Sequence, residues 1–112
     1  MSEALKQVEM SMDFAKGLIA KKESFDRLIQ NKDFQSLIEN DYFLVEASRL
    51  VGSRADPSMQ DETQQKQLLG RMDGIGYLRQ YLSCVNMQGT QAMVDMAAHQ
   101  ETREELLSED LD

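Results

Sequence analysis

Few residues in this chain have the type and spacing that chemistry requires. His99 follows Asp95 by four residues, so the two side chains would share one helical face, as a pair of metal ligands does. The chain has no other histidine, and a stable metal site needs three or four ligands. We therefore expect no metal site and interpret Asp95 and His99 as a solvent-facing pair near a helix C-terminus.

The remaining reactive groups form incomplete motifs. Gly74-Ile75-Gly76 has the first two glycines of a phosphate-binding loop, but Arg79 occupies the third position and no strand precedes the motif. Cys84 is the single cysteine, and with no histidine within a turn or two we expect a buried, inert thiol. The Glu104-Glu105 pair lies in a solvated stretch, unlike the desolvated carboxyls of acid–base catalysis. The sequence predicts no catalytic residue, no cofactor and no enzymatic activity.

Methionine is the more informative residue type. Met87, Met93 and Met96 lie close together in one segment, and Met10 and Met12 in another. Flexible thioether side chains fill irregular gaps in a core and also suit adaptable binding surfaces. Two interpretations are therefore open: ordinary core filling between two helices, or a methionine-lined face that docks another protein.

The element that would position most of these residues is one long helix. After Asp56-Pro57, no further proline interrupts the chain. Apolar or small residues recur there in alternating steps of three and four, the spacing of a helix seam: Ile75, Leu78, Leu82, Val85, Gly89, Ala92 and Met96. At about 1.5 Å per residue such a helix would be about 70 Å long. Asn86 and Gly89 leave open a break near residues 86–90, although the seam runs through them.

Shorter helices precede the long one. Ser2 can cap a first helix, whose apolar positions again follow steps of three and four: Leu5, Val8, Met12, Ala15 and Ile19. Asn31-Lys32-Asp33 and Asn40-Asp41 predict a stop and restart on either side of a short helix. A third helix should end at Gly52–Asp56, and the long helix should begin at Asp56-Pro57-Ser58. Strand signals are missing.

These patterns predict an all-α fold, either a long-helix hairpin or a coiled-coil-like bundle with two short intervening helices. We expect residues 1–103 to form a single helical domain and residues 104–112 an acidic tail. Hydrophobic residues make up 41% of the chain, which is enough for a modest core. No apolar run approaches the length of a membrane span, and the N-terminus lacks the features of a signal peptide. The sequence therefore predicts a soluble protein with no membrane partner.

The net charge of −8 is concentrated at one end of the chain. Residues 101–112 contain six acidic residues and one basic residue, whereas the first hundred contain 14 acidic and 11 basic residues. Binding to a phosphate backbone needs clustered lysine and arginine, and Lys21-Lys22 is the only adjacent pair. We therefore expect no direct binding to nucleic acid.

The predicted seam is longer than the first helix can cover, so we expect contacts with other protein chains, including a homo-oligomer. The candidate interface residues lie along the long helix: Ile75, Leu78, Leu82, Val85, Met93 and Met96.

Five motifs within roughly residues 26–82 consist of fold-determining residues: Asp33-Phe34, Tyr42-Phe43, Glu46-Ala47 with Arg49-Leu50, Ala55-Asp56-Pro57-Ser58-Met59-Gln60, and Tyr77-Leu78-Arg79-Gln80-Tyr81. With these motifs the chain resembles a family of small acidic helical proteins encoded by tailed bacteriophages. The resemblance implies an association with virion morphogenesis, but it transfers no functional residue.

Two functional hypotheses follow. The first is a non-enzymatic structural or assembly protein of the phage particle, such as a head or neck accessory or an assembly helper. The second is an acidic inhibitor that mimics nucleic-acid phosphates on a host or anti-phage defence protein. Acid gathered at one end favours the first, because a mimic should spread acid over its whole surface. The protein would then act in the host cytoplasm or be incorporated in the virion, with phage or host proteins as partners.

Overall fold

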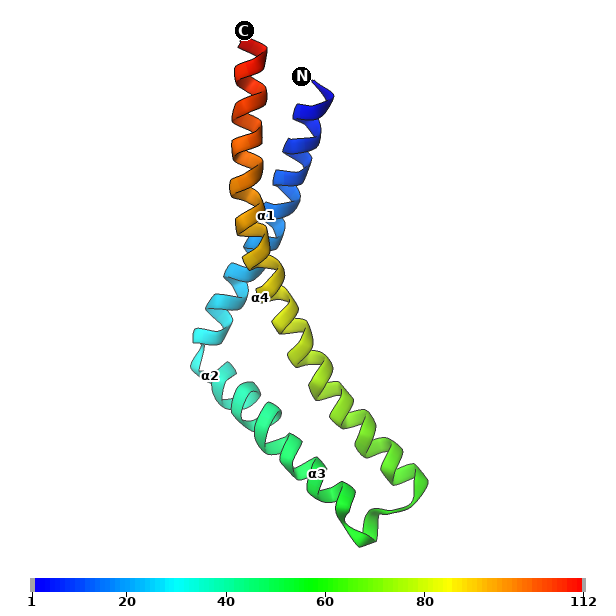
Figure 1. Cartoon of the computed structure of the whole chain (residues 1–112). Helices are drawn as coiled ribbons and strands as arrows, with labels where there is room; N and C mark the ends of the chain where they lie inside the picture. Colours follow the sequence, from blue (N-terminus) through cyan, green and yellow to red (C-terminus); the bar gives the residue numbers. More distant parts are fainter. Residues whose placement is uncertain (1, 112) are drawn as a thin grey trace. The chain divides into compact units, whose positions relative to one another are not determined.

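The computed structural model describes residues 2–111, and the side chains of residues 2–109. Its elements are α1 (Glu3–Gln30), α2 (Lys32–Phe34), the π-helix η1 (Gln35–Glu46), α3 (Ala47–Ala55), the 3₁₀ turn η2 (Pro57–Met59) and α4 (Glu62–Leu111) (Figure 1). Within residues 2–111, all but Ser2, Asn31, Asp56, Gln60 and Asp61 are helical, and no strand occurs. The predicted all-α hairpin is confirmed, and the long helix runs without a break through residues 86–90.

The chain divides into two compact units. Unit 1 contains residues 1–26 and 84–112, and unit 2 contains residues 27–83. Each unit is a pair of antiparallel helical segments, with part of α4 as one member of each pair (Figure 1). Within the described part of the chain, no helix is both long and apolar enough to cross a membrane.

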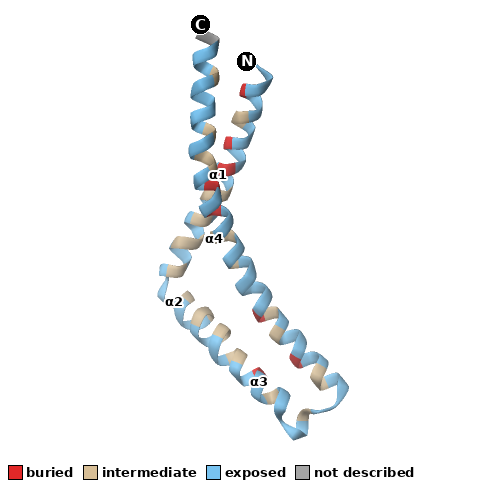
Figure 2. Ribbon diagram, viewed as in Figure 1, coloured by how far each residue is buried: buried red, intermediate tan, exposed pale blue. Residues whose placement is uncertain are grey.

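In unit 1, the beginning of α1 packs on the end of α4. The predicted cap is present, since Ser2 Oγ accepts a hydrogen bond from the Leu5 backbone N–H at 3.1 Å. The buried side chains are Leu5, Met12 and Ala15 from α1 and Ala92 from α4 (Figure 2). Arg103 Nε lies 3.3 Å from Glu9 Oε1 and ties the two helices together near their ends.

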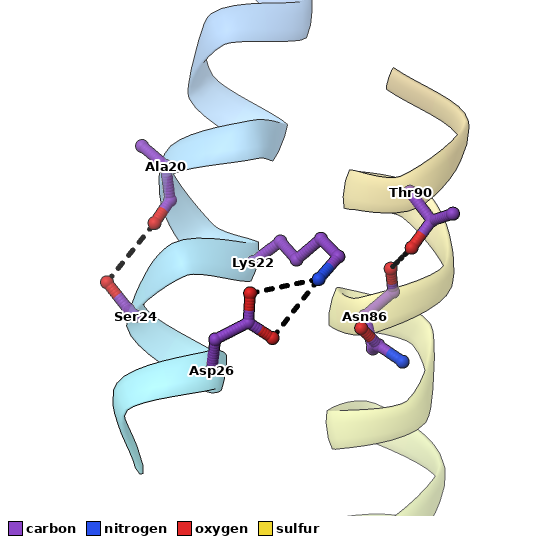
Figure 3. A network of polar contacts seen from close by, with 6 residues as sticks. All are labelled: Ala20, Lys22, Ser24, Asp26, Asn86 and Thr90. Atoms are coloured by element: carbon purple, nitrogen blue, oxygen red, sulfur yellow. Dashed lines mark hydrogen bonds and ion pairs between the residues drawn. The ribbon is translucent and has the colours of Figure 1, made fainter. Parts of the chain in front are cut away.

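Gly89 is buried where α1 passes α4 in unit 1. A Cβ atom placed on it would overlap the Cβ atom of Lys22. The Lys22 side chain packs against Gly89, and its Nζ atom forms an ion pair with Asp26 Oδ2 at 2.9 Å (Figure 3). On α4, the Thr90 hydroxyl donates a hydrogen bond to the Asn86 backbone carbonyl at 2.9 Å, one turn earlier, and the helix continues through both residues (Figure 3). Gly89 therefore permits a close helix contact and does not end the helix.

In unit 2, α2, η1 and α3 form one uninterrupted helical arm, Lys32–Ala55, that packs on the first part of α4. Leu50, Leu68 and Ile75 are buried between them, and five partly buried side chains surround these three (Figure 2): Tyr42, Phe43, Ala47, Met59 and Met72. The Arg79 guanidinium lies over the Phe43 ring, 5.5 Å from its centroid. Two helices thus enclose a narrow core.

The expected break at Asn40-Asp41 is wrong, because η1 continues through both residues. Their side chains bond to each other, with Asn40 Nδ2 2.9 Å from Asp41 Oδ1, and do not cap a helix end. The predicted stop and restart at Asn31-Lys32-Asp33 is present, and Asn31 is the cap, since its Oδ1 accepts from the Phe34 N–H at 2.9 Å.

The third helix ends within the predicted segment Gly52–Asp56, whereas α4 begins later than the predicted Asp56-Pro57-Ser58. Helix α3 passes Gly52 and ends at Ala55, because Asp56 precedes a proline and is extended, with ψ at 126°. Pro57 begins η2, and α4 begins only at Glu62. Its cap is Asp61, whose Oδ1 accepts from the Gln64 N–H at 2.9 Å. Gln65 Nε2 bridges the turn by donating to the carbonyls of Arg54 and Met59.

Candidate protein-interaction surfaces

The residues with metal-ligand spacing line a groove in unit 1. Asp95 and His99 are both half-buried on α4, and Asp95 Oδ1 accepts a hydrogen bond from Gln91 Nε2 at 3.0 Å. The groove has a volume of about 380 Å³, and α1 contributes Met10, Phe14 and other largely apolar residues to it. Among the residues that the structure describes, no group of three or more His, Cys, Asp or Glu side chains is placed to hold a metal ion.

Cys84 is exposed, so the expectation of a buried thiol is wrong. The reason is its position on α4: Cys84 lies five residues before the buried Gly89, which places it on the opposite side of the helix. The Gly74-Ile75-Gly76 motif lies inside α4 and forms no loop. Ile75 belongs to the core of unit 2, and a Cβ atom on Gly74 would meet the Tyr42 hydroxyl at 3.8 Å.

The six predicted interface residues fall on both sides of the unit boundary. In unit 2, Ile75 is only 4% exposed, because α3 and α4 of the same chain cover it. Leu82 is half-buried and Leu78 is 36% exposed. In unit 1, Val85 and Met96 are half-buried, whereas Met93 is 55% exposed. Leu78 and Met93 therefore present the most surface to another chain, and Ile75 presents almost none.

The methionines divide between the two interpretations. Met12 is buried between α1 and α4, and Met96 is half-buried, as core-filling residues are. Met10, Met87 and Met93 are exposed. The exposed three fit an adaptable surface better than a core.

A second heptad pattern runs along α1 apart from the pattern that packs on α4, and two of its members, Met10 and Phe14, line the groove of unit 1 together with Ala92, Asp95 and His99 of α4. We define the α1 outer stripe by six residues in alternating steps of four and three: Glu3, Gln7, Met10, Phe14, Gly17 and Lys21. All six are exposed, and Met10 and Phe14 each retain 71% of their surface. This stripe was not among the predicted interface residues, because only two of its members are large and apolar. Its regular spacing was the available signal.

Helix α4 has an equivalent outer face in unit 1. We define the α4 outer stripe by seven residues in the same alternating steps: Cys84, Met87, Gln91, Val94, Ala98, Glu101 and Glu105. All seven are exposed. Each helix of unit 1 thus has one apolar face that packs on its neighbour and one mixed face whose members are exposed.

Unit 2 also exposes more large apolar side chains than it buries. Its buried residues are Leu50, Leu68 and Ile75. Nine large apolar side chains of its residues 27–83 are exposed: Leu28, Leu37, Leu44, Val45, Val51, Leu69, Tyr77, Leu78 and Tyr81. Tyr77 and Tyr81 lie one turn apart on α4, and amphipathic rings of this kind are common in protein interfaces.

Two carboxylates of unit 2, Glu46 and Asp56, are hydrogen-bonded to residues close to them in the sequence. Arg49 Nε donates to Glu46 Oε2 at 2.9 Å, and this hydrogen bond holds the pKa of the Glu46 carboxyl below its usual range. The Asp56 carboxylate accepts from the backbone N–H and the hydroxyl of Ser58, which likewise lowers the pKa of Asp56. Asp56 is exposed and Glu46 is half-buried, and the two interactions order the surface of the arm and the turn that follows it.

Comparison of this chain with protein-family models, with curated proteins and with solved structures finds no match.

Proposed function

We propose that this chain is a non-enzymatic bacteriophage protein that acts in virion structure or assembly through helix-mediated contacts with other protein chains. The observation that carries the proposal is the pair of exposed heptad stripes in unit 1, one on α1 and one on α4. Regular seams of this type pack against further helices. An exposed set of large apolar residues in unit 2 supports the same role.

The phage assignment rests on the resemblance of residues 26–82 to small acidic helical phage proteins. Several of the residues that carry the resemblance build unit 2: Tyr42, Phe43, Ala47 and Leu50 lie in or beside its core, and Asp56 orders the turn before α4. These residues determine the fold of unit 2 and name no partner. A head or neck accessory or an assembly helper fits a protein whose surface consists of helical faces.

The decisive experiment is quantitative mass spectrometry of purified particles of the phage that encodes this chain. A structural role predicts a constant copy number per particle that survives repeated density-gradient purification. An assembly helper predicts the protein in immature particles and its loss from mature ones. Presence in neither, with abundant protein in the infected cell, would contradict the proposal.

A second candidate, the acidic inhibitor, is favoured by one observation. Helix α4 continues through the acidic end of the chain and presents Glu101, Glu105 and Glu109 as an exposed row, with one carboxylate per turn. Such a row could occupy a basic surface on a host or defence protein. Replacing the three glutamates by glutamine should abolish inhibition under this hypothesis, whereas particle assembly should not need them.

A further inference from the structure

The α1 outer stripe carries opposite charges at its two ends. Glu3 lies at the start of the stripe and Lys21 at its end, with Met10 and Phe14 near the middle. Both charged residues are exposed, and neither forms an ion pair within residues 2–109. A stripe with this order of residues is complementary to itself when it is reversed.

We propose that the α1 outer stripe is the contact between two copies of this chain, packed antiparallel about a twofold axis between Met10 and Phe14. This inference deepens the proposed function, since it names one partner and the surface that binds it. In this register Glu3 faces Lys21 of the second copy, Gln7 faces Gly17, and Met10 faces Phe14. Each pair occurs twice, because a twofold contact repeats every interaction.

The central pairs fit by size and chemistry. Met10 and Phe14 each retain most of their surface in the single chain, so four large apolar side chains would become buried together. A thioether beside an aromatic ring is a favourable contact in addition to the apolar burial. Gly17 has nothing near the position of a Cβ atom, which leaves space for Gln7 of the second copy.

Two other arrangements of the stripe fit less well. A parallel pair would place Glu3 against Glu3 and Lys21 against Lys21, so that like charges meet at both ends. Packing on the α4 outer stripe of a second copy can pair Lys21 with Glu105, but the same register places Glu3 against Met87 and leaves its charge without a partner. The antiparallel contact alone pairs both charges.

The same register brings one like-charged pair close to the axis. Asp13 flanks the stripe next to Phe14, so the two copies of Asp13 would face each other. Lys16 Nζ, 3.9 Å from Asp13 Oδ1, offsets part of this repulsion. Because Asp13→Asn removes the repulsion between the two carboxylates, it should strengthen the dimer and lower its Kd by roughly twofold to fivefold.

Sedimentation equilibrium of the full chain tests the contact by charge exchange. Glu3→Lys or Lys21→Glu alone should raise the dimer Kd by roughly tenfold, and the double variant should return it to within about threefold of the original value. Phe14→Ala should raise the Kd at least as much as a single charge reversal. Val94→Ala on the α4 outer stripe is the matched control and should leave it unchanged, and circular dichroism should show the same helix content in every variant.

Disulfide trapping tests the direction of the helices independently. In a Cys84→Ser background, Ser11→Cys places a thiol beside the axis, whereas Glu3→Cys places it far from its copy. The antiparallel dimer predicts rapid intermolecular oxidation of the first variant only, whereas a parallel dimer would bring the two Glu3→Cys thiols together and oxidise the second variant.

Three results would overturn the inference: a monomer at hundreds of micromolar, no recovery in the charge-exchanged double variant, or rescue of Lys21→Glu by Glu105→Lys. A monomer that is nevertheless present in virions would remove this contact and leave the proposed function standing. A protein that forms this dimer in solution but is absent from all particles would contradict the proposed function and leave this contact standing.

Discussion

At Gly89, the absence of a side chain decides how closely the two helices of unit 1 can pack. Glycine in a helix interior lowers helix stability by about 1 kcal/mol relative to alanine. The structure shows what offsets this cost, because the Lys22 side chain lies where a Cβ atom would be. The overlap involves Lys22 Cβ, which is fixed to the backbone, so a rotamer change cannot relieve it.

We predict that Gly89→Ala lowers the free energy of unfolding by about 1–3 kcal/mol through overpacking, despite its better helix propensity. Gly76→Ala is the matched control on the same helix, since nothing lies within 4 Å of its Cβ position. It should raise the free energy of unfolding by about 1 kcal/mol. Urea unfolding followed by circular dichroism measures both. Equal effects of the two substitutions would contradict the close contact.

Asp56 gives a residue-scale prediction about pH. Two hydrogen bonds from Ser58 lower the pKa of Asp56 below the usual aspartate value of about 3.9. The ionised Asp56 carboxylate therefore stabilises the folded state fully above that pH. This contribution is lost as the pH falls through the lower pKa that Asp56 has in the folded state. Ser58→Ala removes the hydroxyl donor and keeps the N–H donor, so the pKa of Asp56 should rise only part of the way. Carboxyl carbon NMR titration measures it, and an unchanged pKa would show that the hydroxyl contributes nothing.

At the scale of elements, the start of α4 depends on Asp61. The sequence pattern predicts a start at Asp56-Pro57-Ser58, but the side chain that caps α4 is Asp61, which accepts from the Gln64 N–H. Asp61→Ala should destabilise unit 2 by about 1 kcal/mol through loss of this cap. Ser58→Ala should cost little by comparison, since Ser58 caps no helix. Thermal unfolding of the two variants distinguishes the assignments, and a larger loss for Ser58→Ala would favour the earlier start.

The long elements could be predicted from the sequence, and the middle arm could not. Helices α1 and α4 carry apolar residues in steps of three and four over many turns, which is the period of an α-helix. In the arm Lys32–Ala55, the buried or half-buried residues include a series at every fourth position: Phe34, Ile38, Tyr42, Glu46 and Leu50. This longer spacing fits the wider turn of a π-helix, which is rare at this length. Compared with the 3.6-residue period of an α-helix, this four-residue spacing suggests several short helices separated by breaks.

The interaction surface was also only partly predictable. The sequence reveals every face of a helix that has heptad spacing. It does not reveal which of these faces is covered by another helix of the same chain. Ile75 and Phe14 illustrate the difference: both lie on regular seams, yet Ile75 is buried by its own chain and Phe14 is exposed. That distinction depends on which helices pair within each unit, and long-range pairing has no local sequence signal.

At the scale of the whole molecule, acid is concentrated where α4 ends. Residues 104–111 continue the helix, but their described side chains are exposed apart from the half-buried Leu106. The contact that ties this end of α4 to α1 is Arg103 with Glu9, and it lies before the acidic segment. The segment therefore adds charge and little packing to unit 1. We therefore expect the segment to contribute little to the stability of the fold.

We predict that removal of residues 104–112 leaves the melting temperature nearly unchanged and weakens binding to a basic partner. Exposed ion pairs each contribute at most about 1 kcal/mol and are screened by salt. Binding by the intact chain should therefore fall as salt rises through the physiological range, and the truncated chain should show a smaller dependence. Glu9→Gln is the matched control: it breaks the Arg103 contact inside unit 1 and should lower stability without changing the salt dependence of binding. Pull-downs from infected-cell extract at low and high salt make the comparison. Equal recovery of partners by both chains, with equal salt dependence, would show that the acidic end only keeps the protein in solution.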